Sequence, residues 1–209
     1  MITNKFKIVY LTTLILLGSF NFSNAQNKTE RVNRILFIFD ASKSMTGGWQ
    51  SGRKIDIAQK LLCKMVDSLK NTKNLELGLR IYGHLKGYPP QDCDDSRLEI
   101  KFKPSHVAAD EIKAKLGMIS ARGTTPIAHS LEEGAKDFPN DNARNIVILI
   151  TDGKEECGKD PCAVSRFYQR KGIILKPFVI GIGKDNKWKE SVSCIGRYFN
   201  ASNESEFTD

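Results

Sequence analysis

A continuous apolar run that ends in an acid constrains the fold of this chain more than any other feature. Residues 35–39 are all apolar, with β-branched and aromatic members, which is typical of a strand buried on both faces of a parallel sheet. Asp40, Ser42 and Ser44 follow, at the carboxyl end of that strand, where open α/β sheets bind their ligands. Hard oxygen atoms in one place suit a small hard cation such as Mg²⁺. The alternative is that these side chains only cap the next turn.

A second apolar run of the same kind, residues 146–150, ends in Thr151-Asp152-Gly153 and delivers another acid. Segments with helical periodicity alternate with the strands, which predicts a mainly parallel sheet covered on both faces. The expected helices are 54–70, 105–119, 126–136, 161–172 and 187–195, and the other expected strands are 75–82, 98–102, 173–182 and 198–200.

Between the two acidic strands, Gly123-Thr124-Thr125-Pro126 leads into a predicted helix. Proline suits the first position of a helix, because its missing N–H would have no partner there. Thr125 is then expected at the N-cap, a common role for threonine.

Together these residues resemble the metal-ion-dependent adhesion site (MIDAS) of the von Willebrand factor A family. The resemblance implies an α/β, Rossmann-like three-layer sandwich whose mostly parallel central sheet carries one short antiparallel edge strand, here 98–102. It implies that the ion is bound by Asp40, Ser42, Ser44, Thr125 and Asp152, with Thr124 the alternative to Thr125.

The family resemblance also implies a function. Members of the family bind a protein partner through its Asp or Glu, which occupies the remaining position on the metal. The ion is expected to be Mg²⁺, or another divalent cation such as Mn²⁺ or Ca²⁺. Ile127 departs from the pattern, since many adhesive members have a hydroxyl at this position. The resemblance therefore extends to metal binding but not to the loop movements that accompany ligand binding in those members. Lys43 and Lys154 flank the site. They are either ordinary solvated surface lysines or positive charges that attract an acidic partner.

The first 25 residues are predicted to be a secretory signal peptide. Lys5 and Lys7 give a basic start, 8–20 is mostly apolar, and small residues precede the expected cleavage near Ala25. The apolar run is shorter than the ~20 residues of a spanning helix. We therefore expect export to the periplasm or the exterior, no stable membrane span, and one domain over 26–209; an uncleaved anchor is the alternative.

Loss of the two signal lysines would lower the formal net charge from +8 to +6. The remaining basic residues are scattered and form no stripe, so nucleic-acid binding is not supported. At the other end, Asn203 and Glu206 resemble a capping box just before the chain stops. A domain that lacks its last helix and a frayed polar tail are equal alternatives.

Five cysteines lie in the predicted mature chain, and export permits disulfides. Cys157–Cys162 is the favoured pair because the closed loop is short, with Cys93 bonded to either as the rival. Cys63 and Cys194 lie on predicted helices and are expected to be buried free thiols. Zinc binding through Cys157 and Cys162 lacks a second ligand pair.

Three classes of function compete. A non-enzymatic, metal-dependent binding module is favoured, because the scattered histidines His84, His106 and His129 supply no catalytic partner near the metal. A phosphatase-like hydrolase with Asp40 as nucleophile would need an acid at position 42, which is serine. A structural domain with an unused site is the third, since Ser, Thr and Asp can satisfy one another by hydrogen bonds.

Overall fold

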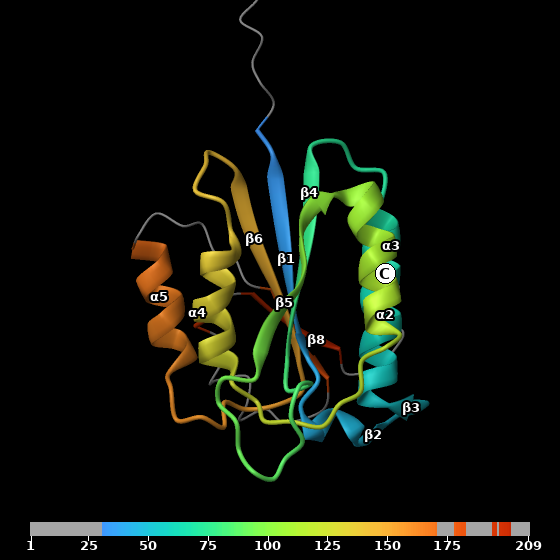
Figure 1. Ribbon diagram of the computed structural model, residues 1–209, viewed down its shortest axis with the longest axis vertical. Helices are drawn as coiled ribbons and strands as arrows, with labels where there is room; N and C mark the ends of the chain where they lie inside the picture. Colours follow the sequence, from blue (N-terminus) through green and yellow to red (C-terminus); the bar gives the residue numbers. More distant parts are fainter. Residues whose placement is uncertain (1–30, 171–177, 183–193, 196, 202–209) are drawn as a thin grey trace, which may run out of the picture. The chain divides into compact units, whose positions relative to one another are not determined.

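The computed structural model of the chain describes residues 31–170, 178–182, 194–195 and 197–201 (Figure 1). Its elements, in chain order, are β1 (Asn33–Asp40), the 3₁₀ turn η1 (Lys43–Thr46), β2 (Gly48–Trp49), β3 (Gly52–Arg53), α2 (Lys54–Leu69), β4 (Leu75–Tyr82), β5 (Ser96–Pro104), α3 (Ser105–Leu116), α4 (Ile127–Asp137), β6 (Arg144–Thr151), α5 (Pro161–Arg170), β7 (Phe178–Ile182) and β8 (Arg197–Ala201).

The main sheet has six strands in the order β5-β4-β1-β6-β7-β8. β1 pairs in parallel with both β4 and β6, and β7 and β8 continue the parallel arrangement. Among the described strands of this main sheet, only β5 is antiparallel to its neighbour. The predicted fold class is confirmed, although the edge strand is longer than expected, at nine residues instead of 98–102.

The two faces of the sheet bury alternate residues of β1, as a strand with period two must. Ile35, Phe37 and Phe39 lie in one core cluster with α2 and α3, whereas Leu36 and Ile38 lie in the other with α4 and α5. Figure 1 shows α2 and α3 on one side of the strands and α4 and α5 on the other. This two-sided burial explains why the β1 sequence is apolar without alternation.

The helix boundaries differ from the predicted ones by a few residues, as helix ends usually do. α2 begins at Lys54 as expected, and α4 begins at Ile127, one residue later than expected. Within the range predicted as a turn after Ser44, the chain forms η1 and the two-residue strands β2 and β3. The predicted signal 1–25, most of the helix 187–195 and the residues after Ala201 lie outside the described residues.

Candidate metal centre

Three loops meet at the carboxyl ends of β1, β4 and β6. Ser42 forms an isolated parallel bridge with Gly123, and the Lys43 N–H donates to the Gly123 carbonyl at 2.8 Å. Gly83, just after β4, has φ of +69°, and a Cβ on it would lie 2.7 Å from both the Ser42 nitrogen and the Thr124 oxygen. Only glycine fits this conformation and this approach. The backbone thus fixes the loop after β1 against residues 123–126, which we call the threonine loop.

The oxygen donors predicted from the sequence come together here. The Ser42 and Ser44 hydroxyls are 3.0 Å apart, and Ser44 Oγ donates to Asp152 Oδ1 at 2.7 Å. Thr125 lies beside them, because a Cβ built on Gly153 would be 3.6 Å from both Ser44 Oγ and Thr125 Oγ1. Gly153 therefore leaves space between hydroxyls of two different loops.

Asp40 is the most deeply enclosed member of the group. Its residue is fully buried, Oδ1 accepts from the Ser42 N–H at 2.8 Å, and Oδ2 accepts from the Thr151 hydroxyl at 2.6 Å. Burial, and then the charge of Asp152, raises the pKa of Asp40 to about 6. The nearby Tyr82 hydroxyl is buried and has no hydrogen-bond partner among the residues that the structure describes. A cation would relieve the cost of this buried charge.

The predicted N-cap is wrong in detail. Pro126, not Thr125, occupies the N-cap of α4, and no side chain of that loop caps the helix. An acid after β6 does so instead: Glu155 accepts the Ala128 N–H, in the first turn of α4, at 2.7 Å, while its neighbour Glu156 accepts the N–H of Thr125, just before the helix, at 3.0 Å. Carboxylates stabilise a helix N-terminus because they bind its free N–H groups and oppose its dipole. The Thr125 hydroxyl is therefore not used by a cap.

Sequence reasoning missed Lys54, whose ammonium lies 2.5 Å from Asp152 Oδ2. It also missed Thr151, Glu155 and Glu156 as supporting residues. The sequence signal that could have indicated Glu155 and Glu156 is that two acids follow closely after the strand that ends at Asp152. For Lys54, the first residue of α2, no local pattern distinguished it from the other lysines of that helix.

The donor set fits a hard divalent cation. Hydroxyl and carboxylate oxygens face one another, Gly153 leaves room, and the donors to the buried Asp40 among the described residues are neutral. Within the described residues there is no cluster of three or more His, Cys, Asp or Glu that could hold a metal. A metal site here would therefore depend on serine and threonine hydroxyls in addition to the two carboxylates.

The sequence profile of the von Willebrand factor type A domain matches residues 35–209. The chain belongs to the von Willebrand factor type A (VWA) family. Two similar proteins of Bacillus subtilis strain 168 are uncharacterised: YwmD is 31% identical over 185 residues, covering 83% of this chain and 80% of its own, and YwmC is 26% identical over 212 residues, covering 94% and 90%.

Several solved structures share the VWA fold. The PilB minor pilin of Streptococcus sanguinis has a TM-score of 0.66 at 14% identity, over 86% of this chain and 59% of the pilin. Proximal thread matrix protein 1 of the mussel byssus, solved with a zinc-occupied MIDAS motif, has a TM-score of 0.64 at 19% identity, over 85% and 43%. This chain thus spans less than two thirds of either protein. Among the described residues, no helix is long and apolar enough to cross a membrane.

Two disulfides hold the loops of this VWA domain. Cys93 is bonded to Cys157 and Cys162 to Cys194, so the favoured Cys157–Cys162 pair and the free Cys194 thiol were both wrong. The rival pairing of Cys93 with Cys157 is confirmed, and Cys63 is free as predicted but only half-buried. The loops after β4 and β6 meet because both strands flank β1, and this adjacency decided the pairing more than the short loop between Cys157 and Cys162.

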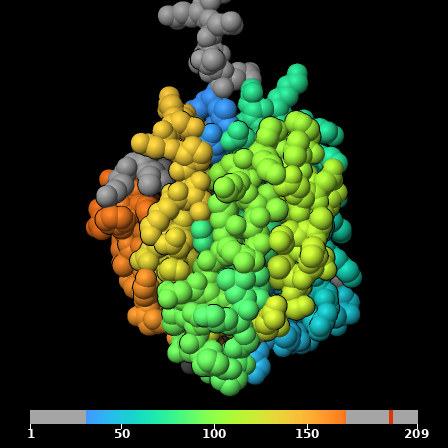
Figure 2. Space-filling model, in the orientation of Figure 1, coloured from blue at the N-terminus to red at the C-terminus, as the bar shows by residue number. Residues whose placement is uncertain are grey.

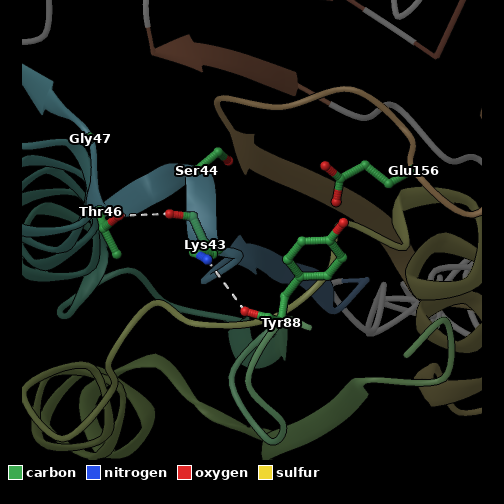
Figure 3. A pocket seen from close by; sticks show the side chains of 7 residues that line it. Lys43, Ser44, Thr46, Gly47, Tyr88 and Glu156 are labelled. Carbon is green, nitrogen blue, oxygen red and sulfur yellow. Dashed lines mark hydrogen bonds between the residues drawn. The ribbon is translucent and has the colours of Figure 1, made fainter. Parts of the chain in front are cut away.

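A pocket of about 420 Å³ opens beside the metal residues (Figure 3). Lys43 lies on one side, where its ammonium is 5.7 Å from the Tyr88 ring centre. Glu156 lies on another side, as Figure 3 shows. The full lining is Lys43, Ser44, Thr46, Gly47, Tyr88, Gly123 and Glu156. In the space-filling view, the loop between β4 and β5, in green, forms the lower end of the face that is turned to the viewer (Figure 2).

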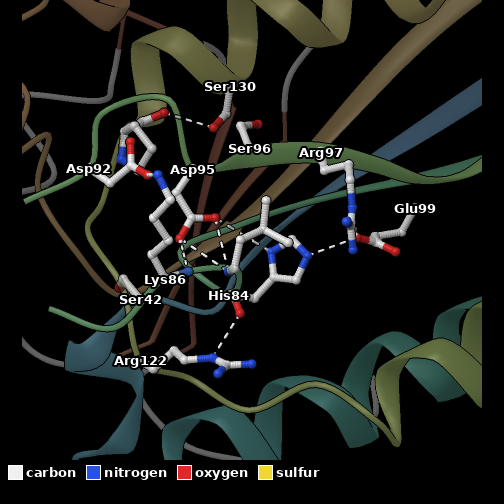
Figure 4. A network of polar contacts seen from close by, with 12 residues as sticks. Ser42, His84, Lys86, Asp92, Asp95, Ser96, Arg97, Glu99, Arg122 and Ser130 are labelled. Carbon is white, nitrogen blue, oxygen red and sulfur yellow. Dashed lines mark hydrogen bonds and ion pairs between the residues drawn. The ribbon is translucent and has the colours of Figure 1, made fainter.

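His84 and Asp95, in the loop between β4 and β5, are buried in a polar network (Figure 4). His84 Nε2 is 2.8 Å from Glu99, and Glu99 also pairs with Arg97 and Lys115. Asp95 accepts backbone N–H groups of its own loop. Burial lowers the pKa of His84, even though Glu99 favours its charged form. These residues shape the loop and are not available to a partner.

Proposed function

We propose that this VWA domain binds one divalent cation through Asp40, Ser42, Ser44, Thr125 and Asp152, and that it binds a protein partner through an Asp or Glu of that partner. The observation that carries the proposal is the chain of close oxygens from Ser42 through Ser44 to Asp152, beside the buried Asp40. The ion is Mg²⁺ or another hard divalent cation such as Mn²⁺ or Ca²⁺. When bound, it would supply an open coordination position for the partner's carboxylate.

The proposal includes a non-enzymatic role. The position two residues after Asp40 is Ser42, whose backbone N–H donates to Asp40, so no acid is present there to protonate a leaving group. The zinc-occupied MIDAS of the mussel protein supports metal binding by the shared fold. The two disulfides support an oxidising, extracytoplasmic location.

Thermal unfolding with and without Mg²⁺ tests the metal part. The wild type should melt at a higher temperature in Mg²⁺ than in chelator, because the ion binds only the folded state. Asp40→Ala should lose this shift. Asp137→Asn is the matched control: it removes another almost buried carboxylate, paired with Arg80 at 2.7 Å, and should lower the melting temperature while keeping the Mg²⁺ shift. Equal shifts in wild type and Asp40→Ala would refute the site.

A resin that carries immobilised glutamate tests the partner chemistry. The domain should be retained in Mg²⁺ and released by chelator. A matched resin that carries glutamine presents no carboxylate and should not retain it. Retention that ignores chelator, or that is the same on both resins, would contradict binding through a metal-bound carboxylate.

A further inference from the structure

Lys54 already provides a cation within the proposed metal centre. It is the first residue of α2, and its backbone N–H donates to the Gly47 carbonyl at 2.9 Å, which fixes the start of the helix beside the site. From there its ammonium reaches Asp152 Oδ2 at 2.5 Å. The Asp152 side chain is 0% exposed and that of Lys54 is 23% exposed. The pair is therefore shielded from solvent on the carboxylate side.

The negative charges of the two acids, Asp40 and Asp152, are compensated differently. Asp152 divides its oxygens, with Oδ1 bonded to the Ser44 hydroxyl and Oδ2 to Lys54. Both hydrogen-bond donors to Asp40 are neutral. Two carboxylates and one ammonium leave the centre with one net negative charge. A divalent cation would turn this into one net positive charge, which a single carboxylate from outside would cancel.

We propose that Lys54 sets the metal affinity of the site and couples it to the acidic partner. By neutralising Asp152, it keeps the affinity for a divalent cation low while no partner is present. The same positive charge then favours arrival of a carboxylate. Metal and carboxylate consequently bind better together than either binds alone, and by linkage each raises the affinity of the other equally. This inference rests on the metal-binding function proposed above.

Calorimetric titration of the full chain with Mg²⁺ and with Mn²⁺, each with and without acetate as the carboxylate probe, tests the role of Lys54. Lys54→Met should bind either metal at least ~10-fold more tightly than wild type without acetate, because a charge next to the ion is removed. Acetate should raise metal affinity in wild type and much less in Lys54→Met. Lys54→Arg, which keeps the charge, should resemble wild type.

Lys60→Met is the matched control, since it makes the same charge change at an exposed position of the same helix. It should bind both metals as wild type does. Melting temperature in chelator gives a second measurement: Lys54→Met leaves Asp152 buried without its ion pair and should be less stable, and Mg²⁺ should raise its melting temperature more than that of wild type. If Lys54→Met does not fold, Lys54→Gln, which can still donate to Asp152, replaces it.

The outcomes separate this inference from the function on which it rests. If wild type binds metal and Lys54→Met binds it equally or more weakly, the role of Lys54 is wrong and the metal site stands. If only Lys54→Met binds metal, Lys54 controls the site as proposed, but wild type is not a metal-binding module. If neither binds, both proposals fail.

Discussion

Asp40 and Glu99 are both almost completely buried carboxylates, yet their pKa values move in opposite directions. Asp40, at the end of the central strand β1, has its pKa raised to about 6 by burial and by the charge of Asp152. Burial also acts to raise the pKa of Glu99, on the edge strand β5, but hydrogen bonds from Arg97, His84 and Lys115 outweigh it and lower that pKa to about 2.

The comparison teaches that cations, not burial, separate a structural acid from an acid in a ligand site. The Glu99 side chain is 4% exposed and has three cationic or protonatable neighbours within 3.0 Å. Asp40 is 0% exposed, and among the described residues its hydrogen-bond donors are Ser42 and Thr151, both neutral. Glu99 thus has its counter-charges within the chain, whereas under the proposed function Asp40 would gain its counter-charge from a bound cation.

The largest expected effect concerns the disulfide that joins the two regions. Cys93 lies in the loop that follows His84, and Cys157 lies next to the acids that hold the Thr125 loop. Replacing both cysteines by serine should lower the free energy of unfolding by about 4 kcal/mol, since the bond closes a loop of 64 residues. Denaturant titration measures this change.

The same double variant sharpens the comparison between the regions. Its Mg²⁺-induced rise in melting temperature should shrink, because Glu155 and Glu156 are no longer held against α4. Cys63→Ser, which removes the free thiol, is the control and should change neither quantity by much. An unchanged Mg²⁺ shift in the double variant would mean that the threonine loop does not need the disulfide.

Glu99→Gln should give the next largest effect. The change leaves Arg97, His84 and Lys115 without their shared anion and should cost about 3 kcal/mol at neutral pH. The pKa of Glu99 is lowered from 4.5 to about 2 in the native state, so its stabilisation is full above pH 4.5 and is lost as the pH falls toward 2, where the native carboxylate takes up a proton; the cost of the variant should therefore shrink over this range. Melting temperatures across this range, for wild type and variant, measure the difference. A gap that does not narrow in acid would contradict the assigned charge network.

Asp40→Asn should change the stability of the fold in the opposite direction to Glu99→Gln. In chelator at neutral pH it should stabilise the domain by about 2 kcal/mol, because it removes a buried charge whose pKa is raised from 3.8 to about 6. The native state holds its proton more tightly than the unfolded state, so wild type should lose stability as the pH rises from about 4 to about 6. The advantage of the variant should therefore be absent below pH 4 and full above pH 6.

Added Mg²⁺ should reverse the ranking of wild type and Asp40→Asn, since only the wild type would gain from the ion. Thermal unfolding at neutral pH in chelator and in Mg²⁺ measures this reversal. A less stable Asp40→Asn in chelator would show that Asp40 is a structural acid like Glu99, and the contrast between the two regions would be lost.

Prediction from sequence succeeded where the signal is local. The apolar runs that end in Asp40 and Asp152 fixed the parallel core and placed both acids at one edge, because strand polarity alone decides which ends meet. It failed where a partner is distant in the chain. Lys54 is 98 residues from Asp152, and Cys162 is 32 residues from Cys194, and neither separation leaves a local pattern.

The threonine loop lies between these cases. Proline and threonine correctly indicated a helix start, but local propensity gave Thr125 the capping role. A tertiary contact from Glu155 supplies that role instead, and Glu156 holds the Thr125 backbone beside it. The hydroxyl of Thr125 thereby remains at the site, which the capping pattern alone would not have indicated.

The smallest change in stability is expected from Gly153→Ala, and it separates space for a ligand from the needs of folding. A Cβ there would lie 3.3 Å from Thr125 Cγ2 and 3.6 Å from Ser44 Oγ, so small shifts accommodate it. Unfolding free energy should change by no more than about 0.5 kcal/mol. Mg²⁺ affinity should fall roughly tenfold, about 1.4 kcal/mol, because the added methyl group would occupy the space between the Ser44 and Thr125 hydroxyls, where the ion is proposed to bind.

Gly48→Ala, where a Cβ meets nothing within 4 Å, is the control and should change neither the unfolding free energy nor the Mg²⁺ affinity. Calorimetric titration with Mg²⁺ decides the matter: if Gly153→Ala binds the ion as wild type does, the space beside Ser44 and Thr125 is not where the cation lies.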